Sequence, residues 1–284
     1  MVRVIPESRL RERRRKQRML RIAVVCGLLL LIFGVLVGLS RASFLRINSV
    51  VVSGASDALA AQVQARVAAQ LAGSYGYVFA RDNIFLYPKA AITKDLLAHF
   101  PELRSVTVEG SSWHALSVAV AERAPVALWC GAGDAVSDSS SIFANQNCFL
   151  LDKNGLVYAP APDAPSSLQK YFGAATSTTT GSDLPKQYLT PAQFASLAAF
   201  VSALAGKVPG DTVASVRVDD ANNARVAFIS GFELRFLLSD NAGDVLQHFA
   251  LAQTASIFKT HQLSDFLYLD LRFGEKIYYK LKNQ

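Results

Sequence analysis

Residues 22–39 read IAVVCGLLLLIFGVLVGL, eighteen consecutive residues without a charge. As an α-helix this run would be about 27 Å long, close to the roughly 30 Å hydrocarbon core of a bilayer. A cleaved signal peptide would have a shorter apolar region and a small-residue exit, whereas this run leaves through Ser40-Arg41-Ala42-Ser43. A buried core helix is the other alternative, but so close to the N-terminus it would have no preceding chain to pack against. We therefore expect one membrane-spanning helix.

The charge of the chain is concentrated before this run. Residues 1–21 contain nine Lys or Arg and two Glu, a net charge of +7, whereas residues 22–284 contain 20 basic and 20 acidic residues and are formally neutral. A basic block can be an arm that binds nucleic acid. Placed immediately before a spanning helix, it is more simply the signal that keeps this end in the cytoplasm. We expect a cytoplasmic tail at 1–21, no nucleic-acid partner, and residues 41–284 across the membrane.

The cysteines agree with that orientation. Cys26 lies in the apolar run, which leaves Cys130 and Cys148 as the only pair in the exported part. In an oxidising compartment the two can form a disulfide, which would stabilise the fold by about 3 kcal/mol on the chain-entropy model. The alternative is two unpaired thiols. Two cysteines without further ligands at suitable spacing make a poor zinc site.

The first part of the exported chain predicts a strand followed by a helix. Residues 44–54, FLRINSVVVSG, are rich in Val and Ile and favour a strand. Apolar side chains then recur at every fourth position between a Ser56-Asp57 cap and Gly73, which predicts an amphipathic helix.

A second helix and two strands follow an aromatic, irregular segment at 75–87. Pro88 opens the helix, and Pro101 ends it because the residue before a proline is pushed out of the helical region. Alternating apolar residues predict strands at 103–109 and 115–121, with Gly-Ser-Ser between them as the turn. The predicted order is strand, helix, helix, strand, strand.

This order and the phrases FLRINSVVVSG, NIFLYP, FPELRSVTVEG and LSVAVAERAPVALW resemble the POTRA domain of the FtsQ/DivIB family of bacterial cell-division proteins. In that family a short basic tail and one spanning helix precede the POTRA domain. The passage from Glu122 to Ala127, ERAPVA, is similar to the family's E-R-x-P-V-A transition into a following β domain. Where the family usually has a proline ahead of the third strand, this chain has Trp113-His114.

The segment up to residue 187 begins a mainly β domain. A strand at 126–129 leads to Cys130, and after a polar loop at 131–147 two strand halves flank the turn residues of 152–155, DKNG, which resembles the family's D-x-x-G phrase. Residues 159–187 are rich in Pro, Ala, Ser, Thr and Gly and show no apolar period, which predicts a flexible insertion.

The rest of the chain predicts one capped helix and a further set of strands. Thr190 caps the helix, with Pro191 in its first position and Gly206 at its end. A second helix is expected at 243–260, and strands are expected at 212–218, 224–230, 232–239, 266–272 and 276–281. The phrase YLDLRF that begins at Tyr268 resembles the family's Y-x-D-L-R-Y signature before its last strand.

No pattern of catalytic or metal-binding residues stands out. The four histidines are scattered without ligand spacing, and there is no G-x-S-x-G elbow or Gly-rich phosphate loop. A membrane-tethered hydrolase is the rival class, but the sequence gives it no residues. We expect no reaction, no cofactor and no metal.

The end of the chain has the features of a binding surface. The segment 274–281, GEKIYYKL, mixes charge with aromatics, and a last strand at a sheet edge can pair with a strand of a partner. The alternative is that its lysines only protect the edge from aggregation. The resemblance favours binding, because the partners FtsB and FtsL of FtsQ-like proteins dock here. It implies partner contact through Phe273, which replaces the family's tyrosine, and through Glu275, Lys276, Ile277, Tyr278, Tyr279 and Lys280.

The predicted fold class is α+β, with a spanning helix at 22–39, a POTRA domain at 44–123 and an FtsQ-type, mainly antiparallel β domain at 124–282. The resemblance implies a non-enzymatic scaffold that lies in the inner membrane at the division septum. It would recruit and regulate septal peptidoglycan synthesis through FtsB-like and FtsL-like partners. A POTRA-bearing translocation or assembly factor is the alternative, but neither a second repeat nor barrel-type strands are evident.

Overall fold

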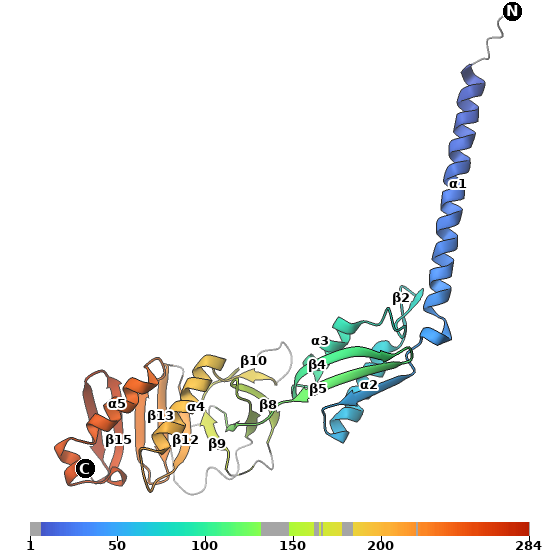
Figure 1. Cartoon of the computed structure of the whole chain (residues 1–284). Helices are drawn as coiled ribbons and strands as arrows, with labels where there is room; N and C mark the ends of the chain where they lie inside the picture. The colour runs from blue at the N-terminus through green and yellow to red at the C-terminus, as the bar shows by residue number, and fades with distance from the viewer. Residues whose placement is uncertain are drawn as a thin grey trace, which may run out of the picture. The chain divides into compact units, whose positions relative to one another are not determined.

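The computed structural model describes residues 7–131, 148–161, 165, 167–177, 184–219 and 221–283, of which 7–14 are described as backbone only (Figure 1). The chain divides into two compact units, Met1–Glu122 and Arg123–Gln284. The protein is of the α+β class, as the sequence predicts. Residues 132–147 of the predicted polar loop and parts of the predicted insertion at 159–187 lie outside the described residues.

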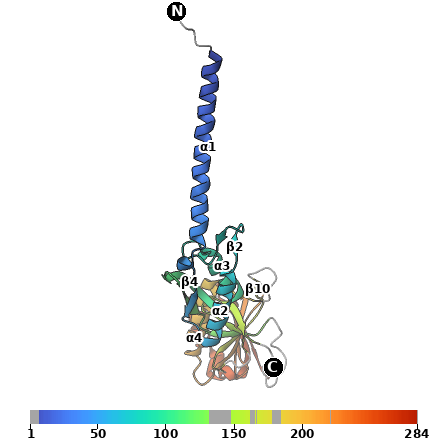
Figure 2. The same ribbon diagram turned by 90° about the vertical axis from the view of Figure 1, so that its right-hand side faces the viewer.

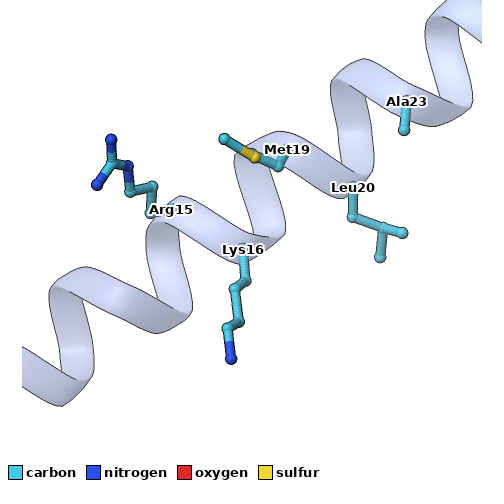
Figure 3. A pocket seen from close by; sticks show the side chains of 5 residues that line it. All are labelled: Arg15, Lys16, Met19, Leu20 and Ala23. Atoms are coloured by element: carbon cyan, nitrogen blue, oxygen red, sulfur yellow. The ribbon is translucent and has the colours of Figure 1, made fainter.

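Helix α1 (Glu7–Ser40) is longer than the predicted span, because the basic residues before the apolar run continue the helix. Arg, Lys, Gln, Leu and Met all have high helix propensity, so nothing interrupts the helix at residue 21. Figure 3 shows the change from Arg15 and Lys16 to Met19, Leu20 and Ala23 along this helix. The hollow that these five side chains flank belongs to the surface of a single helix and is not a cleft. Among the described helices, α1 is long and apolar enough to cross a membrane, and none of its apolar stretch is buried in the protein.

The first unit continues as a strand-helix-helix-strand-strand layout with a small added hairpin. Its elements are the 3-10 turn η1 (Ser43–Leu45), β1 (Ser49–Ser53), α2 (Asp57–Leu71), β2 (Ser74–Tyr75), β3 (Phe79–Ala80), α3 (Lys89–His99), β4 (Leu103–Ser112) and β5 (Ala115–Glu122). The sheet order is β1-β5-β4, with β1 parallel and β4 antiparallel to β5. Helices α2 and α3 bury Val63, Val67, Ile92 and Leu96 against Val108, Leu116 and Val118 of this sheet.

Two predictions for this unit are wrong in detail. The strand expected at 44–54 forms only over β1, because residues 43–45 make a 3-10 turn. The turn expected at Gly-Ser-Ser is part of β4, which pairs with β5 through Gly110↔Leu116 and Ser112↔Ala115, so the chain reverses at Trp113-His114 instead. A Cβ at Gly110 would lie 2.9 Å from Cδ1 of Ile84, so a larger residue here would require the end of that side chain to shift.

The second unit is built on one large sheet. Its strands are β6 (Ala127–Trp129), β7 (Phe149–Leu151), β8 (Leu156–Pro160), β9 (Gln169–Phe172), β10 (Thr176–Ser177), β11 (Lys186–Gln187), β12 (Val213–Val218), β13 (Asn223–Phe228), β14 (Glu233–Leu237), β15 (Phe266–Phe273) and β16 (Lys276–Leu281). The order is β10-β11-β8-β7-β6-β9-β12-β13-β14-β15-β16. The sheet is mainly antiparallel; the parallel pairs are β6 with β9, β9 with β12, and β14 with β15.

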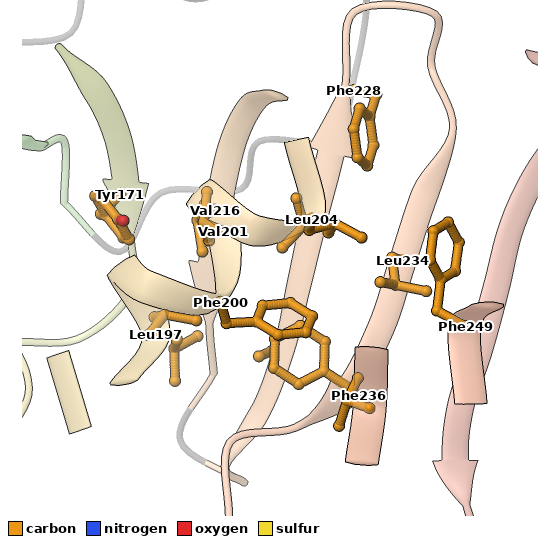
Figure 4. Close-up of a cluster of buried hydrophobic side chains, with 14 of the residues drawn as sticks. Tyr171, Leu197, Phe200, Val201, Leu204, Val216, Phe228, Leu234, Phe236 and Phe249 are labelled. Carbon is orange, nitrogen blue, oxygen red and sulfur yellow. The ribbon is translucent and has the colours of Figure 1, made fainter. Parts of the chain in front are cut away.

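Helices α4 (Pro191–Ala205) and α5 (Ala242–Ala252) pack on one face of this sheet. Thr190 caps α4 as predicted, in a capping box with Gln193. Phe200 and Leu204 of α4, with Phe249 of α5, point into the core between helices and strands (Figure 4). Phe200 lies 4.5 Å, centroid to centroid, from the ring of Phe236 on β14.

Two further predictions fail in this unit. The helix expected at 243–260 ends at Ala252, and a separate 3-10 turn, η3 (Ser256–Lys259), follows it. The segment 159–187, predicted as a flexible insertion, contains β9, whose Tyr171 and Phe172 are buried between β6 and β12. A short strand that depends on partners far along the chain gives no periodic pattern of its own.

Candidate functional site: the last strand and the sheet face beside it

Strand β16 is the last strand of the large sheet and pairs with β15 on one side only. The pairing is antiparallel, with Leu269↔Tyr279 and Asp270↔Tyr278 in register. Strand β16 therefore lies at an edge of the sheet, as predicted. Alternate residues of this six-residue strand direct their backbone N–H and C=O groups to its free side.

The side chains of β16 alternate between the two faces of the sheet. Ile277 and Leu281 pack against the helix-covered core, and the ring of Tyr279 lies 5.6 Å from that of buried Phe266. Lys276, Tyr278 and Lys280 are exposed and belong to the opposite face. Tyr279 also keeps 46% of its surface exposed, so both faces of the strand present an aromatic side chain to solvent.

The turn before β16 brings two of the predicted residues together. The Phe273 and Tyr278 rings meet edge to face at 5.0 Å, and both are about half exposed, at 55% and 51%. Gly274 has φ +65°, a conformation that favours glycine in this tight reversal. Glu275 is exposed in the same turn. Phe273, Tyr278 and Tyr279 are called the edge cluster below.

The D-L-R motif holds this turn in place. Arg272 binds the Asp270 carboxylate through two bonds, Nε to Oδ1 at 2.8 Å and Nη2 to Oδ2 at 2.6 Å, and its Nη1 donates to Asn223 of β13. Burial acts to raise the pKa of Asp270, but the hydrogen bonds from the Arg272 side chain and backbone outweigh it and hold the pKa below its usual value. The Arg272 guanidinium also lies 5.7 Å from the Phe273 ring centre.

A row of arginines crosses the sheet face that β16 shares. Register places Arg217 opposite Arg225, Arg225 opposite Arg235, and Arg235 opposite Asp270, which in turn pairs with Tyr278. Like charges directly opposite each other are unfavourable, and local partners moderate them. Arg235 pairs with Glu233 at 2.8 Å and lies over the Tyr268 ring at 4.1 Å. This row was not predicted from the sequence, although each arginine stands between apolar residues in its strand.

Side chains of the E-R-x-P passage make contacts in both units. Glu122 Oε1 accepts a hydrogen bond from the Ser56 backbone N–H at the start of α2. Arg123 donates to the carboxylate of Asp152 at 2.6 Å, and Asp152 Oδ1 accepts from two backbone N–H groups of the β7–β8 turn. The motif thus fastens each end of the passage to its own unit.

Cys130, which follows β6, and Cys148, which precedes β7, form a disulfide. The described residues hold no group of three or more His, Cys, Asp or Glu side chains that could bind a metal ion. The histidines are apart: His114 bonds the Arg46 carbonyl, and His261 contacts Thr260. Comparisons with protein-family models and with curated proteins give no match to this chain.

Proposed function

We propose that this protein is a membrane-anchored, non-enzymatic scaffold of the bacterial division machinery that resembles FtsQ. In this proposal α1 spans the inner membrane with its basic end in the cytoplasm, the first exported unit is a POTRA domain, and the second is the FtsQ-type β domain. The scaffold recruits and regulates septal peptidoglycan synthesis through FtsB-like and FtsL-like partners. The observation that carries the proposal is the edge cluster beside an open strand edge.

The chemistry of this edge suits an added strand. A partner segment in extended conformation would take up the free N–H and C=O groups of β16, and the half-exposed rings would contact its alternate side chains. The neighbouring face carries Arg217, Arg225 and Arg235, so carboxylate side chains on the partner would meet compensating charge. Buried aromatic residues and arginines are the residues that most often dominate binding energy at interfaces.

The backbone offers a precise way to test strand addition. The Lys282 N–H donates to the Asp265 carbonyl, and alternation along β16 then directs the N–H groups of Lys280 and Tyr278 toward β15. The N–H of Tyr279 accordingly points to the free side of the strand. Proline at this position removes that donor without removing a bond to β15.

The experiment is co-purification of the full chain from detergent-solubilised membranes, comparing Tyr279→Pro with Tyr279→Ala. Both variants lose the ring, but only the proline loses the outward N–H. We expect Tyr279→Pro to lose an FtsB-like or FtsL-like single-pass partner that Tyr279→Ala still captures in part. A folded Tyr279→Pro chain that keeps its partners as well as Tyr279→Ala does would refute pairing at this edge.

A further inference from the structure

The first unit has an apolar groove where α1 joins the rest of the unit. About 350 Å³ in volume, it is lined by Leu36, Leu39, Leu45, Phe79, Phe85 and Leu86, with Ser40 and Asn83 as the polar contributors. At its rim the Phe85 and Trp113 rings meet edge to face at 6.0 Å, and the two residues are 70% and 63% exposed. Phe79, Phe85, Leu86, Trp113 and the 93% exposed Tyr77 are called the hairpin cluster below.

We infer that this groove and the hairpin cluster are a lipid-binding surface that sits in the outer interfacial layer of the same bilayer that α1 crosses. The inference rests on the proposed anchoring by α1 and goes beyond it, because it assigns the lipid contact to exported residues. Figures 1 and 2 both show the β2–β3 hairpin beside the end of α1.

The inference rests on how far along the apolar run of α1 the hairpin contacts the helix. The rings of Phe33 on α1 and Phe79 on β3 lie 5.9 Å apart, and Phe33 is six residues before the end of the apolar run. At about 1.5 Å per residue, Phe79 therefore lies about 9 Å inside the apolar length of the helix. If the hydrocarbon core ended on the N-terminal side of Phe33, before this contact, residues 22–32 would cover only about 16 Å of the roughly 30 Å required. Adding Met19 and Leu20 would bring this to only about 21 Å.

The junction is fixed rather than a free linker. Asn83 is buried, and its side chain donates to the Ser40 carbonyl at 3.0 Å and accepts from the Phe85 N–H at 2.9 Å. Arg41, directly after α1, donates to the carbonyls of Tyr77 and Val78 in the hairpin. These bonds hold the hairpin against the helix and satisfy two carbonyls that lipid would leave without a partner.

The composition of the surface favours lipid over a soluble partner. Tyr and Trp rings are typical of the membrane–water interface, where their polar atoms face headgroups and their rings face acyl chains. The segments 40–48 and 73–87 contain three arginines and a single acid, Asp82, which is paired with Arg46 at 2.6 Å. The groove is also continuous with Leu36 and Leu39 on the exposed side of the span. An acyl chain beside α1 can therefore extend directly into it.

The two tryptophans of the chain make a direct test possible, because Trp113 lies at the rim and Trp129 is buried in the second unit. The full chain is reconstituted into phosphatidylcholine vesicles with or without bromine on the acyl chains, which quenches tryptophan on contact. We expect brominated lipid to quench most of the emission of Trp129→Phe, in which Trp113 is the remaining tryptophan. It should quench none of the emission of Trp113→Phe, in which Trp129 remains. If Trp129→Phe does not fold, subtracting Trp113→Phe from the wild type gives the same quantity.

A rim variant separates contact from tethering. Phe85→Glu puts a charge beside Trp113 and should reduce the bromolipid quenching, whereas Leu97→Glu, on exposed α3 surface outside the groove, should not. A chain that floats with the vesicles but shows no quenching of Trp113 would overturn the inference and leave the anchor intact. The inference is also overturned if Trp113 is shielded from aqueous iodide but not quenched by bromolipid, since a protein would then cover the rim. Failure to float with the vesicles would refute the anchor itself.

Discussion

The two clusters of exposed aromatic side chains, one in each unit, differ in the backbone that carries them. In the edge cluster the rings are on and beside β16, which pairs with β15 alone, and Lys276 and Lys280 flank Tyr278 on its face of the sheet. In the hairpin cluster, Tyr77 and Phe79 are on the β2–β3 hairpin, whose strands pair with each other and two of whose carbonyls accept hydrogen bonds from Arg41. Phe85 is beside it, and the backbone N–H of Phe85 is bound by Asn83. An aromatic patch with open backbone groups suits a peptide strand, and one whose backbone groups are paired suits lipid.

The first prediction concerns the packing of α5 that supports the strands next to the edge cluster. Phe249 of α5 is fully buried beneath β14 and β15, so Phe249→Ala should lower the free energy of unfolding of the second unit by about 4 kcal/mol. Urea unfolding in detergent of the full chain carrying Trp113→Phe, in which Trp129 is the remaining tryptophan, measures this through its emission. Leu251→Ala is the matched control on the same helix, because Leu251 is 57% exposed and should change stability by less than about 0.5 kcal/mol. Equal effects of the two variants would contradict the packing described for α5.

The second prediction concerns the carboxylate behind the edge cluster. Asp270→Asn leaves Arg272 without its ionic partner, and we expect a loss of roughly 3 kcal/mol in unfolding free energy at pH 7. The pKa of Asp270 is lower in the folded than in the unfolded chain, so its stabilisation is fully present above the unfolded value of about 3.9 and declines as the pH falls through the folded pKa.

Urea titrations of wild type and Asp270→Asn at several pH values measure that decline. The gap between the two chains should be constant from neutral pH down to about pH 5 and narrow below about pH 4. Asp240→Asn is the control, because Asp240 is exposed in the turn after β14 and should leave the profile unchanged. A gap that stays the same at acid pH would mean that Asp270 does not act through its charge.

The contrast between the units also separates what local sequence can predict from what it cannot. Helix α4 begins where Thr190 and Pro191 predict, because a cap and its first turn are made by neighbouring residues. The edge position of β16 was predicted because the D-L-R phrase before it resembles a family signature, and not from a local physical signal of this kind. The hydrogen bonds of the D-L-R motif reach Asn223 on another strand, and no spacing in the sequence indicates this partner.

Two of the wrong predictions, at 159–187 and at 110–112, share one physical cause, which is pairing with strands that are distant in the sequence. Strand β9 has only four residues and exists because β6 and β12 flank it on either side. Gly110, Ser111 and Ser112 favour a turn by themselves, but pairing with β5 keeps them extended. The hairpin cluster was visible in the sequence only as an irregular aromatic segment. Its contact with Phe33 appears once the chain is folded.

The smallest expected effect tests the other side of the comparison, the fixed junction of the hairpin cluster. Asn83→Ala would leave the Ser40 carbonyl and the Phe85 N–H without their partner in a buried site, so the first unit should lose about 2 kcal/mol. The loss should be local, because the two bonds join α1 to the segment that carries Phe85 and Leu86. Amide hydrogen exchange of residues 83–87 in vesicles, measured by mass spectrometry, should be faster in the variant.

The exposed Asn48 provides the control, because Asn48→Ala removes the same amide group at the surface and should leave the exchange of residues 83–87 unchanged. If Asn83→Ala speeds exchange and also reduces the bromolipid quenching of Trp113, a fixed junction is what holds the hairpin cluster at the depth of the lipid. Faster exchange with full quenching would mean that the aromatic side chains find the interface without help from Asn83. The edge cluster should be unaffected in either case, because its position depends on Asp270 and Arg272 in the other unit.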